Sequence, residues 1–584
     1  MAVFLSLFAG AGQQFFTNAG VPLAGGKIYT YGAGGSTPQA TYTTSAGNIA
    51  HSNPIVLDAA GRVPGGGEIW LTNNLAYKFV LQTSVNVTVQ TLDNIGGGVD
   101  GATLAGSGGS ALVGFIQAGS GAVLRTAQSK MRDVISVKDF GAVGDGVTDD
   151  TAAIQAALDA CPSGGQVELN NGVYAITAQL TVPISSITLD GRGATIKAKN
   201  NTSFEYMLLA QNLSSIVVKN VTFDANKANR VSGQNVRFMG AAFLTCSDSA
   251  FINCTAKNCL GYNSIPGVGL AAAGQSVRCR FEGCSLIDCG GNSGTDAADG
   301  IFTSGNSNVI SNCISSNCTD TAFVIESSND SIITGCASYG SASAAAISNA
   351  SSDTKYANVI DGLTVINWKA SNTGGIGITV PTATVGNLIG TIVSNVTMYA
   401  ELGGGFGVGA AINVRSVGSG KPIGTTISGC RILNATTQGI LVLGEQTTIV
   451  GCHVAGTTDA CIQFNTGSIS NNVVGNTLLG GAFGISAIGT ATVTANANLC
   501  QGNGYGIYAF DTSTISAYMN SIVSPSTARY GKDGGASFNM IGLLGDAFML
   551  DNFVGSAPSG ALSDKFPIYD RSANLIGFVP VYNA

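Results

Sequence analysis

The chain has 584 residues, of which 81 are Gly and only 10% are charged, and its formal net charge is −7. The low charge and the lack of a basic block exclude the electrostatic attraction that supplies most nucleic-acid affinity, so nucleic acid is not an expected partner. Abundant Gly, Ser, Thr, Asn, Val and Ile favour short strands and tight turns, and a repeat architecture can fill this length as one body.

The first residues, MAVFLSLFAGAG, are apolar, but no Lys or Arg precedes them. The run covers about a dozen residues, fewer than the roughly 20 that a membrane helix needs. We therefore expect neither a signal peptide nor membrane insertion. The chain would then fold in a reducing cytosol, where its 14 Cys remain thiols.

Hairpin-like alternation follows in GGKIYTYG, NPIVLDAAGRV, EIWLTNN and AYKFVLQT, and predicts a β-rich domain over residues 1–98. A Gly/Ser/Ala-rich stretch at 99–122 reads as a linker, and we extend this linker or neck to residue 136. The segment TDDTAAIQAALDAC predicts a helix with Thr148 or Asp149 as its N-cap. Its apolar face would cover the open end of the next domain, and consists of Ala153, Ile154, Ala157 and Leu158.

A short motif repeats along the middle of the chain: an apolar residue, a small or polar one, Asn or Gly, and then Cys. Successive copies are 30, 29, 23, 94 and 22 residues apart, and their cysteines are Cys254, Cys284, Cys313, Cys336, Cys430 and Cys452. The gap of 94 holds two weaker copies, with Leu363 and Val396 in place of Cys. This period, without helical periodicity, predicts the coils of a parallel β-solenoid from about Asp190 to Asn520.

Two interpretations of these cysteines compete. In a solenoid like residues stack, so the Cys residues would form a buried column of small apolar side chains. The pairs Cys254/Cys259, Cys284/Cys289 and Cys313/Cys318 also look like metal-ligand pairs. One pair per coil at a fixed position is what stacking predicts, and zinc sites favour clustered partners. We therefore expect no metal and no cofactor.

Carboxylates are sparse in the coils, which makes one cluster informative. Within three successive coils lie Glu282, Asp288, Asp296, Asp299, Asp320 and Glu326. Unpaired charges inside a solenoid are costly, so most of these side chains should face outward, where adjacent coils bring them side by side. Two such carboxylates can cleave a glycosidic bond, one as an acid and one as an ionised partner. The competing interpretation is that they are solvated turn or cap residues.

Sugar recognition needs flat apolar surfaces beside polar groups. Longer loops near 260–267 and 290–296 border the acidic coils, as insertions that line a binding face do. The candidates for substrate binding are Glu282, Tyr262, Arg280, Tyr339 and Trp368, with packing or solvent exposure as the alternative for each. Only two His are present, His51 and His453, so triad chemistry is poorly supported.

The stretch VKDFGAVGDGVTDDTAAIQAAL, Val137–Leu158, resembles the opening motif of the pectate-lyase-like β-helix superfamily as it occurs in phage tailspikes. The pair GKIYTY and NPIVLDAAGRV resembles the head-binding domain of tailspikes from short-tailed phages, and FPIYDRSANLIGFVPVYNA resembles a small β-tip of phage tail proteins. The resemblance implies an all-β, right-handed, single-stranded parallel β-helix that forms a homotrimer. Four domains are expected: a virion-binding domain at 1–98, a neck at 99–136, a β-helix at 137–524 and a C-terminal tip at 525–584.

From Gly294, the segment GTDAADGIFTSGNSNVISNCISSNCTDTAFVI resembles the acid cluster of polygalacturonase-type glycosidases. Asp296 or Asp299 would match the first acidic motif and Asp320 the second, with Glu326 as a further acid, whereas the family's His motif is absent. The resemblance implies a virion-tail protein that is made in the host cytoplasm and acts at the host surface. It would bind O-antigen, capsule or exopolysaccharide and hydrolyse it, and its N-terminal domain would bind phage tail or portal-adaptor proteins. A non-enzymatic adhesion spike and a polysaccharide lyase, which needs a Lys, Arg or Tyr base, remain the alternatives.

Overall fold

The computed structural model describes residues 3–9, 12–73, 75–96, 101–229, 239–261, 266–290, 297–369, 374–381, 386–401, 409–540, 553–555, 565–569 and 575–580. Contacts divide the chain into two compact units, Met1–Asp133 and Val134–Ala584. We call the first the N-terminal unit and the second the β-helix unit. Over the described ranges, no helix is long and apolar enough to cross a membrane.

The N-terminal unit is built on an antiparallel sheet. Its strand order is β3 (Ile55–Val56), β2 (Lys27–Gly32), β5 (Ala76–Gln82) and β6 (Thr88–Gly96), while β1 (Val3–Leu5) pairs with β4 (Trp70–Thr72). Every second residue of β5 is buried, which is the alternation expected of a strand with one face on a core. That core includes Ile28, Tyr77, Phe79 and Leu81.

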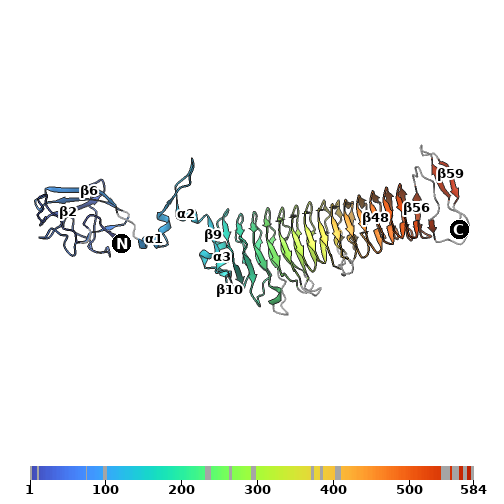
Figure 1. Cartoon of the computed structure of the whole chain (residues 1–584), viewed down its shortest axis with the longest axis horizontal. Coiled ribbons are helices and arrows are strands. Elements are labelled where there is room, and N and C mark those ends of the chain that lie inside the picture. Colours follow the sequence, from blue (N-terminus) through green and yellow to red (C-terminus); the bar gives the residue numbers. More distant parts are fainter. Residues whose placement is uncertain are drawn as a thin grey trace. The chain divides into compact units, whose positions relative to one another are not determined.

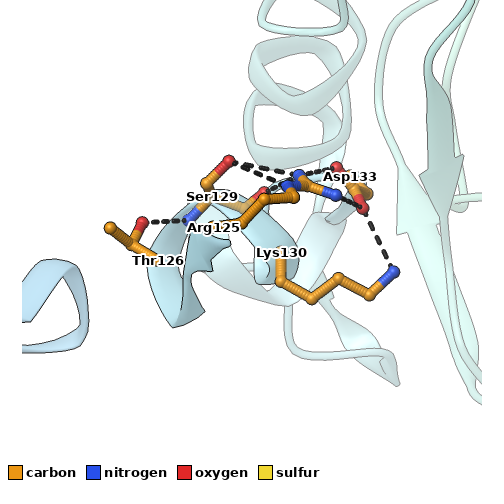
Figure 2. Close-up of polar contacts among 5 residues, drawn as sticks. All are labelled: Arg125, Thr126, Ser129, Lys130 and Asp133. Carbon is orange, nitrogen blue, oxygen red and sulfur yellow. Dashed lines mark hydrogen bonds and ion pairs between the residues drawn. The ribbon is translucent and has the colours of Figure 1, made fainter. Parts of the chain in front are cut away.

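Two short helices, α1 (Gly101–Ala105) and α2 (Ala127–Met131), follow the sheet. Thr126 is the N-cap of α2, and its side chain accepts a hydrogen bond from the Ser129 N–H. Figure 2 shows how Arg125 ties the helix to Asp133: its two terminal nitrogens lie 2.9 and 2.6 Å from the two carboxylate oxygens. Lys130 adds a second cation 3.2 Å from the same carboxylate. Because these groups are exposed, each ion pair contributes little stability.

Three long parallel sheets form the β-helix unit, seen as stacked coils in Figure 1. Sheet A has 16 strands from β9 (Val134–Ser136) to β56 (Ser537–Met540). Sheets B and C have 15 strands each, from β10 (Asp145–Asp149) to β54 (Ser521–Val523) and from β13 (Leu180–Thr181) to β57 (Phe553–Gly555). Each coil passes through A, then B, then C, and pairs in parallel with the next coil. The parallel β-helix predicted from the repeats is confirmed.

Sheet C carries the residues of most interest. After β13 its strands are, in spatial order, β16 (Tyr206–Gln211), β19 (Met239–Leu244), β22 (Gly267–Ala273), β25 (Ala298–Ser304), β28 (Thr321–Glu326), β31 (Ser343–Ser348), β35 (Ile376–Val380), β39 (Ile412–Ser416), β43 (Ile440–Val442), β46 (Ala460–Phe464), β49 (Phe483–Ala487), β52 (Tyr505–Ala509) and β55 (Ala528–Lys532).

The repeated Asn/Gly-Cys motif forms the corner between sheets A and B. Its first residue has a left-handed backbone, with φ of 50° at Asn253 and 63° at Gly283, a conformation that Asn and Gly tolerate best. The following Cys then lies in the core, and all fourteen cysteines are buried free thiols. Neighbouring members are in contact, since the Cys313 N–H lies 3.4 Å from the Cys336 sulfur. The predicted buried Cys column is therefore confirmed.

The predicted capping helix is α3 (Thr151–Asp159). Ile154, Ala157 and Leu158 are buried in the β-helix core, and Ala153 is partly buried against it, so the predicted apolar face is confirmed. Figure 1 shows α3 beside β9 and β10, at the first coils.

The predicted N-cap was wrong by one or two residues, because Asp150 occupies that position. Its carboxylate faces the preceding loop, where it accepts hydrogen bonds from the N–H groups of Val143 at 2.7 Å and Gly144 at 3.2 Å. Asp149 instead accepts from the Thr151 N–H at 3.1 Å and so still satisfies a free donor of the first helical turn.

The regular coils extend further than the Cys motif suggested, from Val134 at one end to strands β56 and β57 at the other. The first coils use apolar residues other than Cys at the corner, such as Ala194 and Val221, so the motif does not reveal them. Beyond the coils, β58 (Lys565–Tyr569) and β59 (Leu575–Pro580) form an antiparallel hairpin.

Candidate active site

Asp299 lies on β25, on the outer side of sheet C. Its strand neighbours Ala298 and Ile301 are in the β-helix core, whereas Phe302 packs into a small separate cluster on the outer side. Val268, which is in register with Asp299 on the preceding coil, belongs to the same outer cluster. Although it faces outward, Asp299 is only 8% exposed, so its carboxyl group sits in apolar surroundings.

Asp320 lies on the next coil, directly before β28. Its backbone N–H donates to the Ala298 carbonyl at 3.3 Å, which places it beside the residue that precedes Asp299. The neighbouring Thr321 N–H donates to Asp299 Oδ1 at 3.1 Å. Two carboxyl groups that are 21 positions apart in the sequence thus come from adjacent coils, which are about 4.8 Å apart in a sheet.

The pKa values of both carboxyl groups are raised above the ordinary value of a free carboxyl group. Burial, and next the negative charge of Asp320, hold the pKa of Asp299 well above its ordinary value, against the hydrogen bond from Thr321. Burial also raises the pKa of Asp320, although hydrogen bonds from Thr321 oppose the shift. Like charges in a poorly solvated site cannot both ionise freely, so the pair tends to hold one proton between its members.

Glu326 is the third acid of this face. It ends β28, in register with Ser304 of β25, and burial raises the pKa of its half-buried carboxyl group. Asp299, Asp320 and Glu326 are therefore three acids with raised pKa on two adjacent coils of one sheet. Perturbed carboxyl groups gathered on one face mark a candidate catalytic site.

The other candidates do not join this group. Glu282 and Arg280 are exposed at the two ends of β23 (Arg280–Glu282) in sheet A, and Tyr339 is 41% exposed at the end of β30 (Ala337–Tyr339) in sheet B. Asp288 forms a turn after a strand of sheet B, with φ of 51°. Asp296 and Tyr262 lie outside the described residues.

The prediction that Trp368 binds substrate was wrong. Its side chain is 1% exposed and belongs to the β-helix core, so no ring face is available to a sugar. It follows Asn367, whose φ is 59°, at the corner between sheets B and C. Cys259 follows Asn258 in the same way, and both side chains point into the core.

The histidines and cysteines offer no alternative site in the described part of the chain. His51 Nε2 lies 2.9 Å from the Glu68 carbonyl oxygen in the N-terminal unit, and His453 is half-buried on sheet B. Among the described residues, no three His, Cys, Asp or Glu side chains are grouped as metal ligands.

Two features of sheet C were missed in the sequence. One is the Thr321 N–H, whose hydrogen bond to Asp299 depends on the pairing of two coils. The other is a group of aromatic side chains on the last coils, Phe483, Tyr505, Tyr508 and Phe510. Their spacing of about one coil could have revealed the second feature, because like residues at that period stack.

Two family models match the β-helix unit. The model of rhamnogalacturonase A/epimerase, pectate-lyase-like, matches residues 134–379, and that of the right-handed β-helix region matches residues 355–522. Among solved structures, a tailspike protein of E. coli bacteriophage HK620 in complex with a pentasaccharide is similar at 15% identity, with a TM-score of 0.49, over 72% of this chain and 83% of that chain.

Curated relatives include phage proteins named tail spike protein and a phage protein named depolymerase. The tail spike protein of Escherichia virus K5 is 28% identical over 32% of this chain and 32% of its own length, and that of Shigella phage Sf6 is 30% identical over 33% and 35%. Depolymerase 1, capsule K30/K69-specific, of Klebsiella phage K5-2 is 30% identical over 36% and 29%.

A bacterial enzyme also matches: mannuronan C5-epimerase AlgE6 of Azotobacter vinelandii is 35% identical over 18% of this chain and 14% of its own length. Each match therefore spans about a third or less of the relative's length. With its three parallel sheets and these two family models, the β-helix unit is a right-handed parallel β-helix of the pectate-lyase-like kind, and about a third of the chain is similar to phage proteins named tail spike protein.

Proposed function

We propose that this chain is a host-attachment spike of a phage virion, and that it hydrolyses a polysaccharide of the host surface with Asp299 and Asp320. The relatives named tail spike protein and depolymerase support the attachment and degradation roles. The observation that carries the proposal is the pair of carboxyl groups on adjacent coils, both with raised pKa and one influenced by the other's charge.

Hydrolysis of a glycosidic bond needs one carboxylic acid and one carboxylate. Asp299, whose pKa burial raises well above its ordinary value, would be the carboxylic acid and would donate its proton to the leaving-group oxygen. Asp320, which is less buried, would be the carboxylate that attacks the sugar carbon or activates a water molecule. When the C–O bond breaks, the leaving sugar takes the proton of Asp299, and water completes the other product.

Glu326 is the reserve candidate for either role, because it lies in the same face and burial raises its pKa too. Asp296 lies outside the described residues and stays a candidate acid on its sequence alone. Among the substrate-binding candidates, Glu282, Arg280 and Tyr339 would contact only a polymer that reaches sheets A and B.

The experiment compares Asp299→Asn, Asp320→Asn and the control Glu282→Gln, an exposed acid of sheet A. Purified O-antigens, capsules and exopolysaccharides are incubated with each protein, and their lengths are measured by size-exclusion chromatography. We expect either Asn variant to shorten the polymer about 10² to 10⁴ times more slowly than the parent chain. Glu282→Gln should cleave like the parent chain. Normal cleavage by both Asn variants would refute the assignment.

The same assay separates the competing activities. A lyase would leave unsaturated ends that absorb ultraviolet light, an epimerase would change the sugars without shortening the polymer, and an adhesion spike would bind without either change. The hydrolase proposal requires shorter products without new absorbance.

The assembly is part of the proposal. We infer that the N-terminal unit binds phage tail or portal-adaptor proteins and that three chains form the spike. Light scattering should give a mass of about three times the 58.7 kDa of one chain. A single-chain mass would contradict the trimer.

A further inference from the structure

The last coils of sheet C carry an aromatic cluster on their outer side, formed by Phe483, Tyr505, Tyr508 and Phe510. Phe483 and Tyr505 are in register on adjacent coils and stack, with ring centroids 5.7 Å apart and planes 13° apart. Tyr508 meets Tyr505 edge-on at 4.7 Å and lies 4.4 Å from Phe510. The cluster is thus a continuous aromatic surface across two coils.

These rings face away from the core. On the same strands Ile485 and Ile507 are fully buried in the β-helix core, whereas the four rings are half-buried and outside it. Aromatic side chains that remain accessible on a folded surface point to a binding role more often than scattered aliphatic ones do.

The cluster also has a polar edge. The Tyr508 hydroxyl donates to Asp533 Oδ1 at 2.8 Å. Burial, and then the hydrogen bond to Asp533 and the charge of Asp533, raise the pKa of Tyr508 to about 12, so its hydroxyl keeps its proton at neutral pH. The second lone pair of that oxygen can still accept a hydrogen bond.

An amide patch, formed by Gln438, Asp459, Gln463 and Asn465, lies one to two coils before the cluster. The Gln438 amide N–H donates to Asp459 at 2.6 Å and to Gln463 at 3.3 Å, and the Gln463 amide donates to Asn465 at 2.7 Å. Gln463 is in register with Ser486, which is in register with Tyr508, so the patch and the cluster share one outward row.

One more polar atom belongs to this row. Asn413 is two coils before Gln463, through Leu441, and is 7% exposed. Its side-chain oxygen is buried and has no hydrogen-bond partner among the described residues. A buried acceptor without a partner costs free energy, which a donating hydroxyl group would recover.

We propose that the amide patch and the aromatic cluster form a binding site for several sugar units of a polysaccharide, separate from the acids. Rings would contact the flat faces of the sugars, while the amide and carboxylate groups would bind their hydroxyl groups. The inference rests on the proposed function and deepens it, because it extends the contact with the polymer along sheet C.

The distance explains what this site adds. β28, which follows Asp320, and β49, which carries Phe483, are six strand intervals apart on sheet C, about 29 Å. A short oligosaccharide would fill only one of the two sites, whereas a long chain would fill both. Two linked contacts raise the affinity for a long polymer through effective concentration, without any new contact at the acids.

A second copy of this chain is the competing occupant. Charged residues are depleted in the cores of protein interfaces, whereas Asp459 and Asp533 lie within this face and bind its amide and hydroxyl groups. The composition therefore favours a hydroxyl-rich ligand over a protein surface.

The test uses the full chain on an array of purified bacterial O-antigens, capsules and exopolysaccharides. The polymer that binds the parent chain best is then titrated against Phe483→Ala, Phe483→Leu and Tyr505→Ala. The control is Tyr399→Ala, which removes a tyrosine that is 38% exposed on sheet B. We expect each cluster variant to bind about tenfold more weakly, and the control to bind like the parent. Phe483→Leu keeps an apolar side chain in place, so weaker binding by this variant would be due to the missing ring and not to misfolding.

Other outcomes overturn the inference in distinguishable ways. Unchanged binding by the cluster variants overturns this inference alone and leaves the proposed hydrolysis intact. An equal loss in Tyr399→Ala means that the effect is not specific to the cluster. A lower assembly mass in the cluster variants would make the face a contact between copies. If the parent chain binds no polymer on the array, the inference and the proposed function both fail.

Discussion

The burial of Asp299 suits its proposed role as an acid but lowers the stability of the folded chain. A carboxyl group that is 8% exposed and lies next to a second carboxyl group ionises only at a cost in free energy. Because its pKa in the folded chain is raised, the stability that it contributes is complete below the ordinary carboxyl pKa of about 4. That stability is lost as the pH rises through the higher, folded value.

Replacing Asp299 with Asn should therefore stabilise the chain at pH 7. The neutral amide keeps an oxygen that can accept the Thr321 N–H, but it removes the buried charge. We expect a gain of about 0.5–2 kcal/mol at pH 7 that disappears as the pH falls to about 4. Urea unfolding at the two pH values measures it. The exposed acid of Glu282→Gln should give no such difference, and lower stability of Asp299→Asn at pH 7 would contradict the prediction.

The sequence predicted single residues unevenly. Asp299 and Asp320 could be predicted, because a column of repeats fixes which coils are adjacent. The sheet to which each residue belongs was harder to predict. Glu282 and Arg280 are close to Asp299 in the sequence, but they lie on sheet A. The prediction for Trp368 was wrong because it used the residue type alone. Trp368 follows Asn367 in the same way that Cys259 follows Asn258 at a corner of the coil, and that position points the side chain into the core.

At the scale of the element, one column of the core changes its chemistry along the helix. From Cys254 to Cys452 the corner between sheets A and B holds mostly cysteines, with Leu363 and Val396 between Cys336 and Cys430, and after Cys452 it holds Asn476, Asn498 and Asn520. Asn498 accepts from the Asn476 backbone N–H at 3.0 Å and donates to the Val473 carbonyl at 2.9 Å. Stacked cysteines contribute mainly packing, whereas stacked amides connect the coils through hydrogen bonds.

Asn498→Ala should consequently loosen the last coils more than a Cys→Ala change loosens the middle ones. It removes the hydrogen bonds of Asn498 with the Val473 carbonyl and with two donors of Asn476, at about 1–3 kcal/mol for each buried group that is left without a partner. Hydrogen exchange should become faster in coils near residues 473–523, as expected for a solenoid in which each repeat contacts its neighbours. Asn472→Ala, which changes an exposed residue of sheet A in the neighbouring coils, is the control. Equal exchange in both variants would contradict the role of the column.

The extent of the β-helix could be predicted only in part. The Asn/Gly-Cys corners identified the middle coils, since left-handed turns and a small buried residue leave a visible motif. In the first and last coils the same corner is filled by Ala, Val or Asn, and any residue that fits the core serves equally well. The core therefore constrains size and polarity, and the motif weakens where neither requires Cys.

At the scale of the whole molecule, the cysteines are confined to one unit. All fourteen lie between Cys161 and Cys500, within the β-helix unit, and all are buried and free. Burial keeps the thiols away from a reagent in solvent, and at two of them it also raises the pKa, to about 12 at Cys500 and about 11 at Cys461, which suppresses the reactive thiolate there. Thiol reactivity is thus a measure of unfolding in the β-helix unit alone.

A thiol reagent such as DTNB should find no reactive cysteine in the native chain and all fourteen after unfolding. Because the thiols are not paired, a reducing agent should leave the melting temperature of the native chain unchanged.

Limited proteolysis at the boundary between the units, Asp133 and Val134, should leave every thiol protected, since the core that buries them lies on one side of the cut. Val85→Cys, at a position in the N-terminal unit that is 76% exposed, should react at once and shows that the reagent is active. Rapid labelling of several thiols in the native chain, or stabilisation by oxidation, would mean that the cysteines are not stacked in a closed core.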